Sequence, residues 1–77
     1  MTIKIFGRPN CASCESAKAF LERRKVKYLY IDVLDLPPQN RMQVIEESGM
    51  QSFPIVKVGD IYIGGYNQLE AYINGRE

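Results

Sequence analysis

The sequence has no histidine, no tryptophan and only two cysteines among its 77 residues. A structural zinc site takes four nitrogen or sulfur ligands, which two cysteines without histidine cannot supply. Ten basic and nine acidic side chains leave a formal charge of +1, with no extended basic run. One local group of cations is expected at a helix end, where it complements the helix dipole: Arg23, Arg24, Lys25 and Lys27. We therefore expect neither a metal nor a nucleic-acid partner.

Long apolar segments are also missing. No run approaches the roughly 18 residues of a membrane-spanning helix, and no signal peptide is recognised before the first predicted strand. We therefore expect a cytoplasmic protein with no membrane partner, acting as a monomer. A second hydrophobic core would not fit in 77 residues, so residues 1–77 are predicted to form a single domain.

Hydrophobic periodicity and turn residues predict seven elements. They are a strand at 2–6, a helix at 12–25, a strand at 27–33, a helix at 38–48, a hairpin of strands at 54–58 and 61–63, and a helix at 66–73. The first strand, helix and second strand predict a right-handed βαβ unit with parallel strands. The expected fold class is therefore α/β, with the order β-α-β-α-β-β-α and a four-stranded mixed sheet flanked by three helices.

Local signals refine these expectations. In the second helix, Met42 and Ile45 are expected to point inward, Asp35 to cap the start, and Gly49 to end the helix. The last helix is expected to stop near Asn74-Gly75. Its predicted core positions are Tyr66, Leu69, Tyr72 and Ile73.

Both cysteines lie in one Cys-x-x-Cys motif, Cys11-Ala12-Ser13-Cys14. A disulfide across so short a loop restricts the unfolded chain very little, so the pair is a poor structural staple. Two small buried hydrophobic residues remain an alternative. Beside a βαβ pattern, however, the spacing is typical of a redox dithiol. Cys11, at the helix N-terminus, is then the predicted nucleophile, with Arg8 as a nearby cation, and Cys14 is the resolving thiol.

Three further stretches extend the pattern beyond the cysteines: Ser52-Phe53-Pro54, then PIVKVGDIYIGG, then GGYNQLEAYI. Together with the strand before CASC, they make the chain resemble a glutaredoxin of the dithiol type along nearly its whole length. The resemblance implies a thioredoxin-like fold and a thiol–disulfide oxidoreductase that uses glutathione as a co-substrate.

The resemblance also implies a binding groove. Pro54 is expected to follow a cis peptide bond and to lie against the cysteine pair. The backbone of Phe53 would pair with glutathione or with a protein substrate. Gly64 and Gly65 would receive the γ-glutamyl end of glutathione. Glycines let a backbone approach closely and a helix N-terminus offers N–H donors, which agrees with this role. A plain turn between strand and helix is the alternative.

Charged and amide side chains complete the implied site. Arg8 matches a cation that often binds the glycyl carboxylate of glutathione, and Arg41 is a weaker candidate for the same role. Asn67 stands where the family frequently has an acidic residue. Ala12 and Ser13 replace the Pro-Tyr of the common Cys-Pro-Tyr-Cys motif. These departures weaken the expected contacts with glutathione.

Three functions remain open at this point. The first is glutathione-linked reduction of protein disulfides or glutathionylated proteins through Cys11 and Cys14. The second keeps the chemistry but donates electrons to ribonucleotide reductase, with recharging by thioredoxin reductase. The third is a carrier in which Cys11 and glutathione from two chains hold an iron–sulfur cluster.

Overall fold

The computed structural model describes residues 2–76, so the ends of the predicted domain, Met1 and Glu77, lie outside the described residues. The elements in chain order are β1 (Ile3–Gly7), α1 (Ala12–Arg23), β2 (Leu29–Asp32), a 3₁₀ turn η1 (Val33–Asp35), α2 (Pro38–Ser48), β3 (Ile55–Val58), β4 (Ile61–Gly64) and α3 (Tyr66–Arg76). The predicted order and the thioredoxin-like α/β fold are confirmed. Among the described helices, none is both long and apolar enough to cross a membrane.

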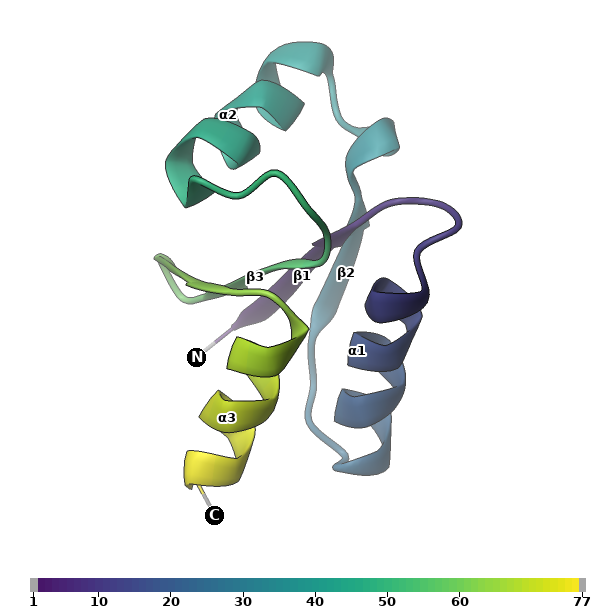
Figure 1. Cartoon of the computed structure of the whole chain (residues 1–77), viewed down its shortest axis with the longest axis vertical. Helices are drawn as coiled ribbons and strands as arrows, with labels where there is room; N and C mark the ends of the chain where they lie inside the picture. Colours follow the sequence, from purple (N-terminus) through teal and green to yellow (C-terminus); the bar gives the residue numbers. More distant parts are fainter. Residues whose placement is uncertain (1, 77) are drawn as a thin grey trace.

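The four strands form one mixed sheet in the order β2-β1-β3-β4 (Figure 1). β1 runs parallel to β2, with Ile5 opposite Tyr30, and antiparallel to β3, with Ile5 opposite Val56. β3 and β4 form the predicted antiparallel hairpin, whose turn contains Gly59 at φ 59°. The parallel pair confirms the predicted βαβ unit, with α1 as its crossover.

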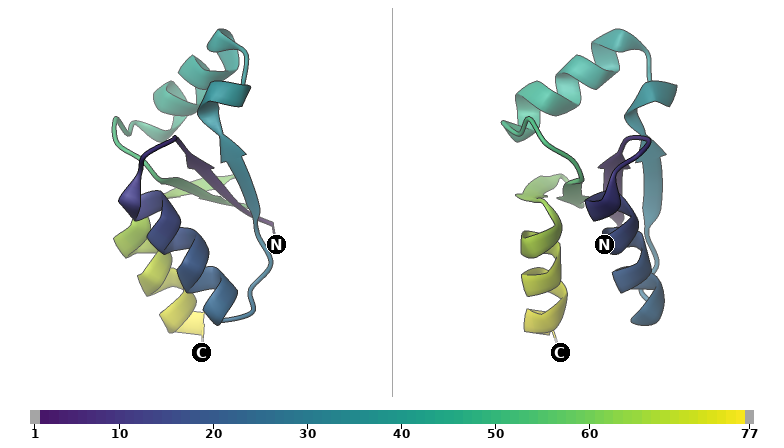
Figure 2. Two further views of the ribbon diagram at one scale, coloured as in Figure 1. Left: turned by 90° about the vertical axis from the view of Figure 1, so that its right-hand side faces the viewer. Right: turned by 45° about the vertical axis from the view of Figure 1, so that its right-hand side comes forward.

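Helices cover both faces of the sheet. α1 and α3 lie side by side on one face and α2 lies on the other (Figure 2). Because strand side chains alternate between faces, Ile3 and Ile5 face α1 and α3, whereas Phe6 faces α2. The larger core joins Ile3, Ile5, Ala17, Phe20, Leu21, Val56, Val58, Leu69 and Ile73. The smaller core joins Phe6, Val33, Val44 and Ile55.

The inward face of α2 differs from the prediction. Val44 is the buried residue of this helix, whereas Met42 is 54% exposed and Ile45 only partly buried. Successive helix residues are rotated by about 100°, so a helix that buries Val44 turns Met42 to the far side. The bounds 38–48 and the end at Gly49, which has φ 70°, are confirmed.

Capping before α2 also differs. The N-cap position is Pro37, which makes no side-chain cap hydrogen bond, so the predicted cap by Asp35 is wrong. Asp32 caps a different element: its Oδ1 accepts from the Leu34 N–H at 2.9 Å at the start of η1. Asp35 is itself the last residue of that 3₁₀ turn.

Other element ends move by a few residues. β1 begins at Ile3 and extends to Gly7, and β2 begins only at Leu29. α1 ends at Arg23 because Lys25 adopts a left-handed φ of 57°. α3 continues through Gly75 to Arg76 rather than stopping near Asn74-Gly75, because a glycine with no positive φ need not end a helix. Tyr66 and Tyr72 are partly buried against the larger core, and Leu69 and Ile73 are fully within it.

Candidate active site

The two cysteines form a disulfide at the start of α1, with Cα atoms 5.2 Å apart. Cys11 is the N-cap residue of that helix, with extended backbone at φ −123° and ψ 101°. Its Sγ accepts a hydrogen bond from the Cys14 N–H at 3.2 Å. A sulfur in this place faces free N–H groups and the positive end of the helix dipole, which favour a thiolate after reduction.

The two sulfurs differ in access to solvent. Cys11 is 8% exposed and Cys14 is 0% exposed, packed into the interior of the first helical turn. A bulky disulfide substrate therefore reaches Cys11 first. The difference follows from their positions, since Cys11 precedes the helix and Cys14 lies one turn further along, next to the sheet.

The loop before Cys11 depends on two backbone features. Asn10 adopts a left-handed φ of 56°, which asparagine tolerates better than most residues and which turns the chain into α1. Gly7 is buried beneath the ring of Tyr30: a Cβ built on Gly7 would lie 2.6 Å from Tyr30 Cζ. Tyr30 therefore packs directly on the strand that leads into the cysteine loop.

A distant segment reaches the cysteines through Pro54. The Phe53–Pro54 peptide bond is cis, as the resemblance implied, and Pro54 is buried. The Phe53 carbonyl oxygen lies 3.8 Å from Cys11 Sγ. A disulfide sulfur carries no proton, so this is a polar contact rather than a hydrogen bond in the oxidised protein. The contact places the Phe53 backbone beside the reacting sulfur.

One groove extends from the cysteine loop toward α3. It is lined by Ser13, Met50, Ser52, Phe53, Pro54, Gly65, Tyr66, Asn67 and Gln68. Among these described lining residues there is no Asp, Glu, Lys or Arg, and we name it the neutral groove. The Tyr66 ring anchors it to the core by an edge contact with Phe20, at 6.1 Å between centroids.

Gly64 and Gly65 directly precede α3, and they differ in backbone conformation and in surroundings. Gly64 has φ 130°, a conformation that residues with a Cβ rarely adopt, and a Cβ there would lie 2.6 Å from Gln68 Cγ. Gly65 lines the neutral groove, and a Cβ there would meet the Pro54 carbonyl oxygen at 3.4 Å, an ordinary contact. Gly64 is therefore required by the backbone, whereas a Cβ on Gly65 would only make ordinary contacts with Pro54, Met50 and Gln68 at 3.4–3.8 Å.

A second groove lies on the β2 side of Cys11. It is lined by Arg8, Pro9, Asn10, Cys11, Ala12, Glu15, Lys18, Tyr30 and Asp32, and we name it the charged groove. Lys18 Nζ lies 3.1 Å from Glu15 Oε2 and 4.2 Å from the centroid of the Tyr30 ring. The hydrogen bond to Glu15 raises the pKa of Lys18. Burial raises the pKa of Tyr30, opposed by the charge of Lys18.

The predicted site residues divide between the two grooves. Arg8 lies in the charged groove, fully exposed, with its guanidinium donating to the Pro9 carbonyl at 3.3 Å. Phe53, Pro54, Gly65 and Asn67 lie together in the neutral groove. Gly64 supports that groove without lining it.

Arg41, the weaker candidate, is engaged elsewhere. Its Nε donates to the Val33 carbonyl at 3.1 Å and its Nη2 to the Leu36 carbonyl at 3.4 Å. These bonds hold the chain between η1 and α2, so Arg41 fixes the turn before α2 and lines neither groove.

Several groove residues were not predicted from the sequence. Lys18 follows Cys14 by four residues, a helical spacing that places both on one side of α1. This spacing could have predicted that Lys18 lies near the cysteine pair. Gln68 occupies the third position of α3, where Glu or Gln often reaches back to the helix start. Ser13 and Tyr30 carried no such signal, because the tertiary fold alone brings them to the grooves.

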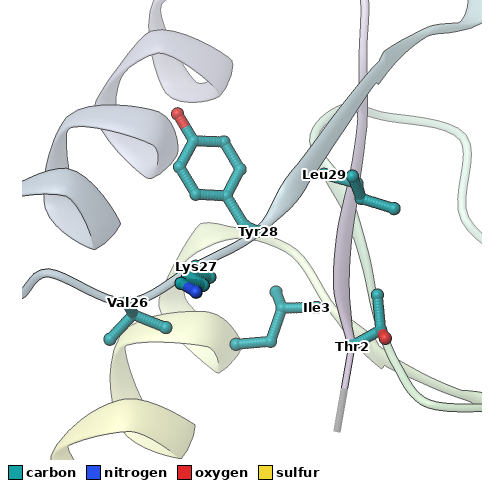
Figure 3. Close-up of a pocket in the computed structure, with 6 residues that line it drawn as sticks. All are labelled: Thr2, Ile3, Val26, Lys27, Tyr28 and Leu29. Atoms are coloured by element: carbon teal, nitrogen blue, oxygen red, sulfur yellow. The ribbon is translucent and has the colours of Figure 1, made fainter.

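A third pocket lies at the opposite end of the β1–β2 pair (Figure 3). It is lined by Thr2, Ile3, Val26, Lys27, Tyr28 and Leu29 and contains no cysteine. The Tyr28 side chain points toward α1, where its hydroxyl donates to Glu22, and burial raises its pKa to about 12. Over residues 2–76, no cluster of three His, Cys, Asp or Glu side chains forms a candidate metal site.

Comparisons with known proteins agree with this geometry. The family model described as Glutaredoxin matches residues 3–63. Glutaredoxin 1 of Rickettsia prowazekii is 32% identical over 69 residues, which cover 88% of this chain and 73% of the relative. The glutaredoxin-like protein NrdH of Salmonella typhimurium is 30% identical over 66 residues, which cover 86% of this chain and 79% of the relative.

The fold comparison gives the same result. The NrdH-redoxin of Escherichia coli superposes with a TM-score of 0.79 at 25% identity, covering 100% of this chain and 96% of that protein. The family match includes the cysteine pair, the cis-proline and most of the β3–β4 hairpin, and it ends just before the double glycine. The chain therefore belongs to the glutaredoxin family and is a thiol–disulfide oxidoreductase.

Proposed function

We propose that this protein reduces protein disulfides and glutathionylated proteins through Cys11 and Cys14, with glutathione as the reductant. The observation that carries this proposal is the pairing of an accessible Cys11 sulfur, capped by the Cys14 N–H at 3.2 Å, with the Phe53 carbonyl 3.8 Å away. The same sulfur is thus stabilised as a leaving or attacking group and placed beside a backbone edge that a peptide can pair with.

The reaction proceeds by two thiol–disulfide exchanges. The Cys11 thiolate attacks one sulfur of the substrate disulfide, forming a mixed disulfide and releasing the other sulfur as a thiolate that takes a proton from water. The Cys14 thiol, losing its proton, then attacks Cys11 Sγ and releases the second substrate thiol. Two electrons pass to the substrate, and the protein is left with the Cys11–Cys14 disulfide. Two glutathione molecules return those electrons and become glutathione disulfide.

Glutathione would lie across the cysteine pair. The Phe53 backbone beside Cys11 suits its central cysteine, and Gly65, just before α3, suits its γ-glutamyl end, with Asn67 in the same groove. Arg8, on the other side of Cys11, suits its glycyl carboxylate. We propose that the protein acts in the cytoplasm as a monomer.

A second function has specific support. A groove without acidic or basic lining residues offers no ion pair to the charged γ-glutamyl group, and two relatives are NrdH proteins. The solved one is described as having a thioredoxin-like activity profile. The alternative is therefore an electron donor to ribonucleotide reductase that thioredoxin reductase recharges. The dithiol chemistry is the same, and only the reductant and the partner differ.

A coupled assay separates the two. NADPH oxidation is followed with a disulfide substrate, once with glutathione plus glutathione reductase and once with thioredoxin reductase alone. Turnover in the first mixture supports the glutathione-linked function, and turnover only in the second supports the alternative. Cys11→Ser is the control, and absence of turnover in both mixtures would contradict both.

A further inference from the structure

A further pocket lies between α2 and the sheet, on the face opposite α1 (Figure 2). Its volume is about 240 Å³, and it shares no lining residue with the neutral groove or the charged groove. We name it the lysine pocket, because Lys4 and Lys57 form its basic side. Its floor is apolar and belongs to, or packs against, the smaller core: Phe6, Ile31, Leu36 and Val44.

The two lysines are direct neighbours across the sheet. Lys4 of β1 is opposite Lys57 of β3 in the antiparallel register. The residues on either side of each lysine point into the larger core, so both lysines point to the α2 face. Both are partly buried, and neither forms an ion pair with another residue of the range 2–76. Like charges directly opposite each other destabilise an antiparallel pair, so an anion between them would relieve repulsion.

Glu47, the acidic residue among the described lining residues, is already engaged. Gln43 Nε2 donates to Glu47 Oε2 at 2.9 Å, and the Tyr62 hydroxyl donates to Glu47 Oε1 at 3.2 Å. These two hydrogen bonds lower the pKa of Glu47, which therefore stays ionised at neutral pH. Lys57 Nζ lies over the Tyr62 ring, 4.9 Å from its centroid. Each oxygen of this carboxylate thus has its own donor, and both ammonium groups remain available to a ligand.

These features select among ligands. The described lining side chains carry two positive charges and one negative charge, a net charge of +1. One carboxylate neutralises that charge, whereas a phosphate dianion exceeds it. An inorganic anion would leave the apolar floor uncovered. The volume lies below the roughly 300–1,000 Å³ that is typical of pockets for drug-sized ligands, which favours a small ligand.

We propose that the lysine pocket binds a small carboxylic acid with an apolar body, whose carboxylate lies between Lys4 and Lys57 and whose body packs on the apolar floor. The inference goes beyond the proposed redox function and does not depend on it, because neither cysteine lines this pocket. Binding can therefore be measured on the protein with its Cys11–Cys14 disulfide intact.

The test is an NMR titration of the isotope-labelled full chain with hydrocinnamate, a phenyl group on a short chain that ends in a carboxylate. We expect a dissociation constant of about 1–10 mM for a ligand of this size. The backbone amide shifts should change at Lys4, Val44, Lys57 and Tyr62. Hydrocinnamamide keeps the body without the charge and should bind about two- to fivefold more weakly, the range of one accessible ion pair. Acetate keeps the charge without the body and should bind more weakly still.

Two variants test the basic side of the pocket. Lys4→Gln and Lys57→Gln should each weaken hydrocinnamate binding about two- to fivefold and leave hydrocinnamamide binding unchanged. Lys25→Gln removes the same charge at an exposed position outside this pocket and is the matched control. Lys4→Gln should also raise the thermal midpoint at low salt, because it removes the repulsion from Lys57. A loss of binding in that variant therefore does not come from unfolding.

The inference is overturned if hydrocinnamate causes no saturable shift changes, if its amide or acetate binds equally well, or if the shifts map to another pocket. Tighter binding of inorganic phosphate would overturn it too, because the apolar body would then contribute nothing. Equal losses in Lys25→Gln and Lys4→Gln would indicate an effect of net charge alone and reject the site. Failure of the proposed redox function is a separate result, in which disulfide turnover is absent while hydrocinnamate still binds.

Discussion

The two grooves beside the cysteine pair differ in the chemical groups that line them. The neutral groove is lined by the Phe53 backbone, Gly65 and amide or hydroxyl side chains, whereas the charged groove presents Arg8, Glu15, Lys18 and Asp32. Backbone and amide contacts depend on close geometry and little on salt. Exposed charges act over a longer range and are screened by salt. The cysteine pair thus lies beside one groove suited to recognition by shape and a second groove suited to recognition by charge.

The two grooves also differ in how firmly they are held. The buried Pro54, the Tyr66–Phe20 ring contact and the hydrogen bond from the Gly65 N–H to Gln68 Oε1 tie the neutral groove to the core and to α3. In the charged groove, Lys18 pairs with Glu15, whose side chain is 69% exposed, and ion pairs with an exposed partner contribute about 0.2–1 kcal/mol. Changes in the neutral groove should therefore affect stability and selectivity together, whereas changes in the charged groove should affect substrate capture alone.

The largest expected effect is at Cys11, which lines the charged groove and lies 3.8 Å from the Phe53 carbonyl of the neutral groove. Cys11→Ser should abolish turnover of every disulfide, because the one other cysteine in the sequence, Cys14, is 0% exposed. Cys14→Ser should keep turnover of glutathione mixed disulfides, which needs only Cys11, and lose that of insulin. The coupled NADPH assay measures both. Residual activity of Cys11→Ser would show that the roles of the cysteines are misassigned.

The next largest effect is on the stability of the neutral groove. Gly64→Ala should lower the free energy of unfolding by about 1–3 kcal/mol, because φ 130° is strained for alanine and the new Cβ meets Gln68. Urea denaturation measures it. Combining Gly64→Ala with Gln68→Ala should recover part of the loss.

The matched control for that experiment is Gly75→Ala. Gly75 lies in the last turn of α3, has no positive φ and leaves open space for a Cβ. Alanine has the higher helix propensity, so this change should leave stability unchanged or raise it by up to about 1 kcal/mol. Equal losses at both glycines would refute the special requirement at Gly64.

A smaller effect is expected in the charged groove. Arg8→Ala should raise KM for glutathione mixed disulfides about two- to fivefold at low salt, the range of one exposed ion pair, and less at high salt. Arg23→Ala removes the same charge at the far end of α1 and serves as control. An Arg8 effect independent of ionic strength would argue against an electrostatic role.

The smallest effect comes from adding charge to the neutral groove. Asn67→Asp places a carboxylate among the lining residues and should lower KM for glutathione substrates up to about fivefold, by pairing with the ligand's ammonium. Asn74→Asp makes the same change at an exposed position further along α3. A raised KM for Asn67→Asp would mean that the γ-glutamyl carboxylate, not the ammonium, lies nearest.

Much of the fold could be predicted because its signals are local. The alternation in β1, the helical spacing from Cys14 to Leu21 and the Gly59-Asp60 turn each specify an element within a few residues. The errors arose where local signals are weak. α2 is polar on most sides and buries only Val44, so its phase could not be fixed from Met42 and Ile45. Asp35 cannot cap α2 because it belongs to the 3₁₀ turn η1, which the sequence did not predict and which Asp32 caps.

The sequence by itself indicated the chemistry of a redox dithiol, from two cysteines one helical turn apart at a helix start. It also determined the order of strands and helices. The tertiary structure alone decided what surrounds Cys11, because Phe53 reaches it from the loop before β3 and Tyr30 lines a groove with it from β2. Periodicity reports which face of an element is buried, but which side chains meet across elements depends on how the sheet and helices pack.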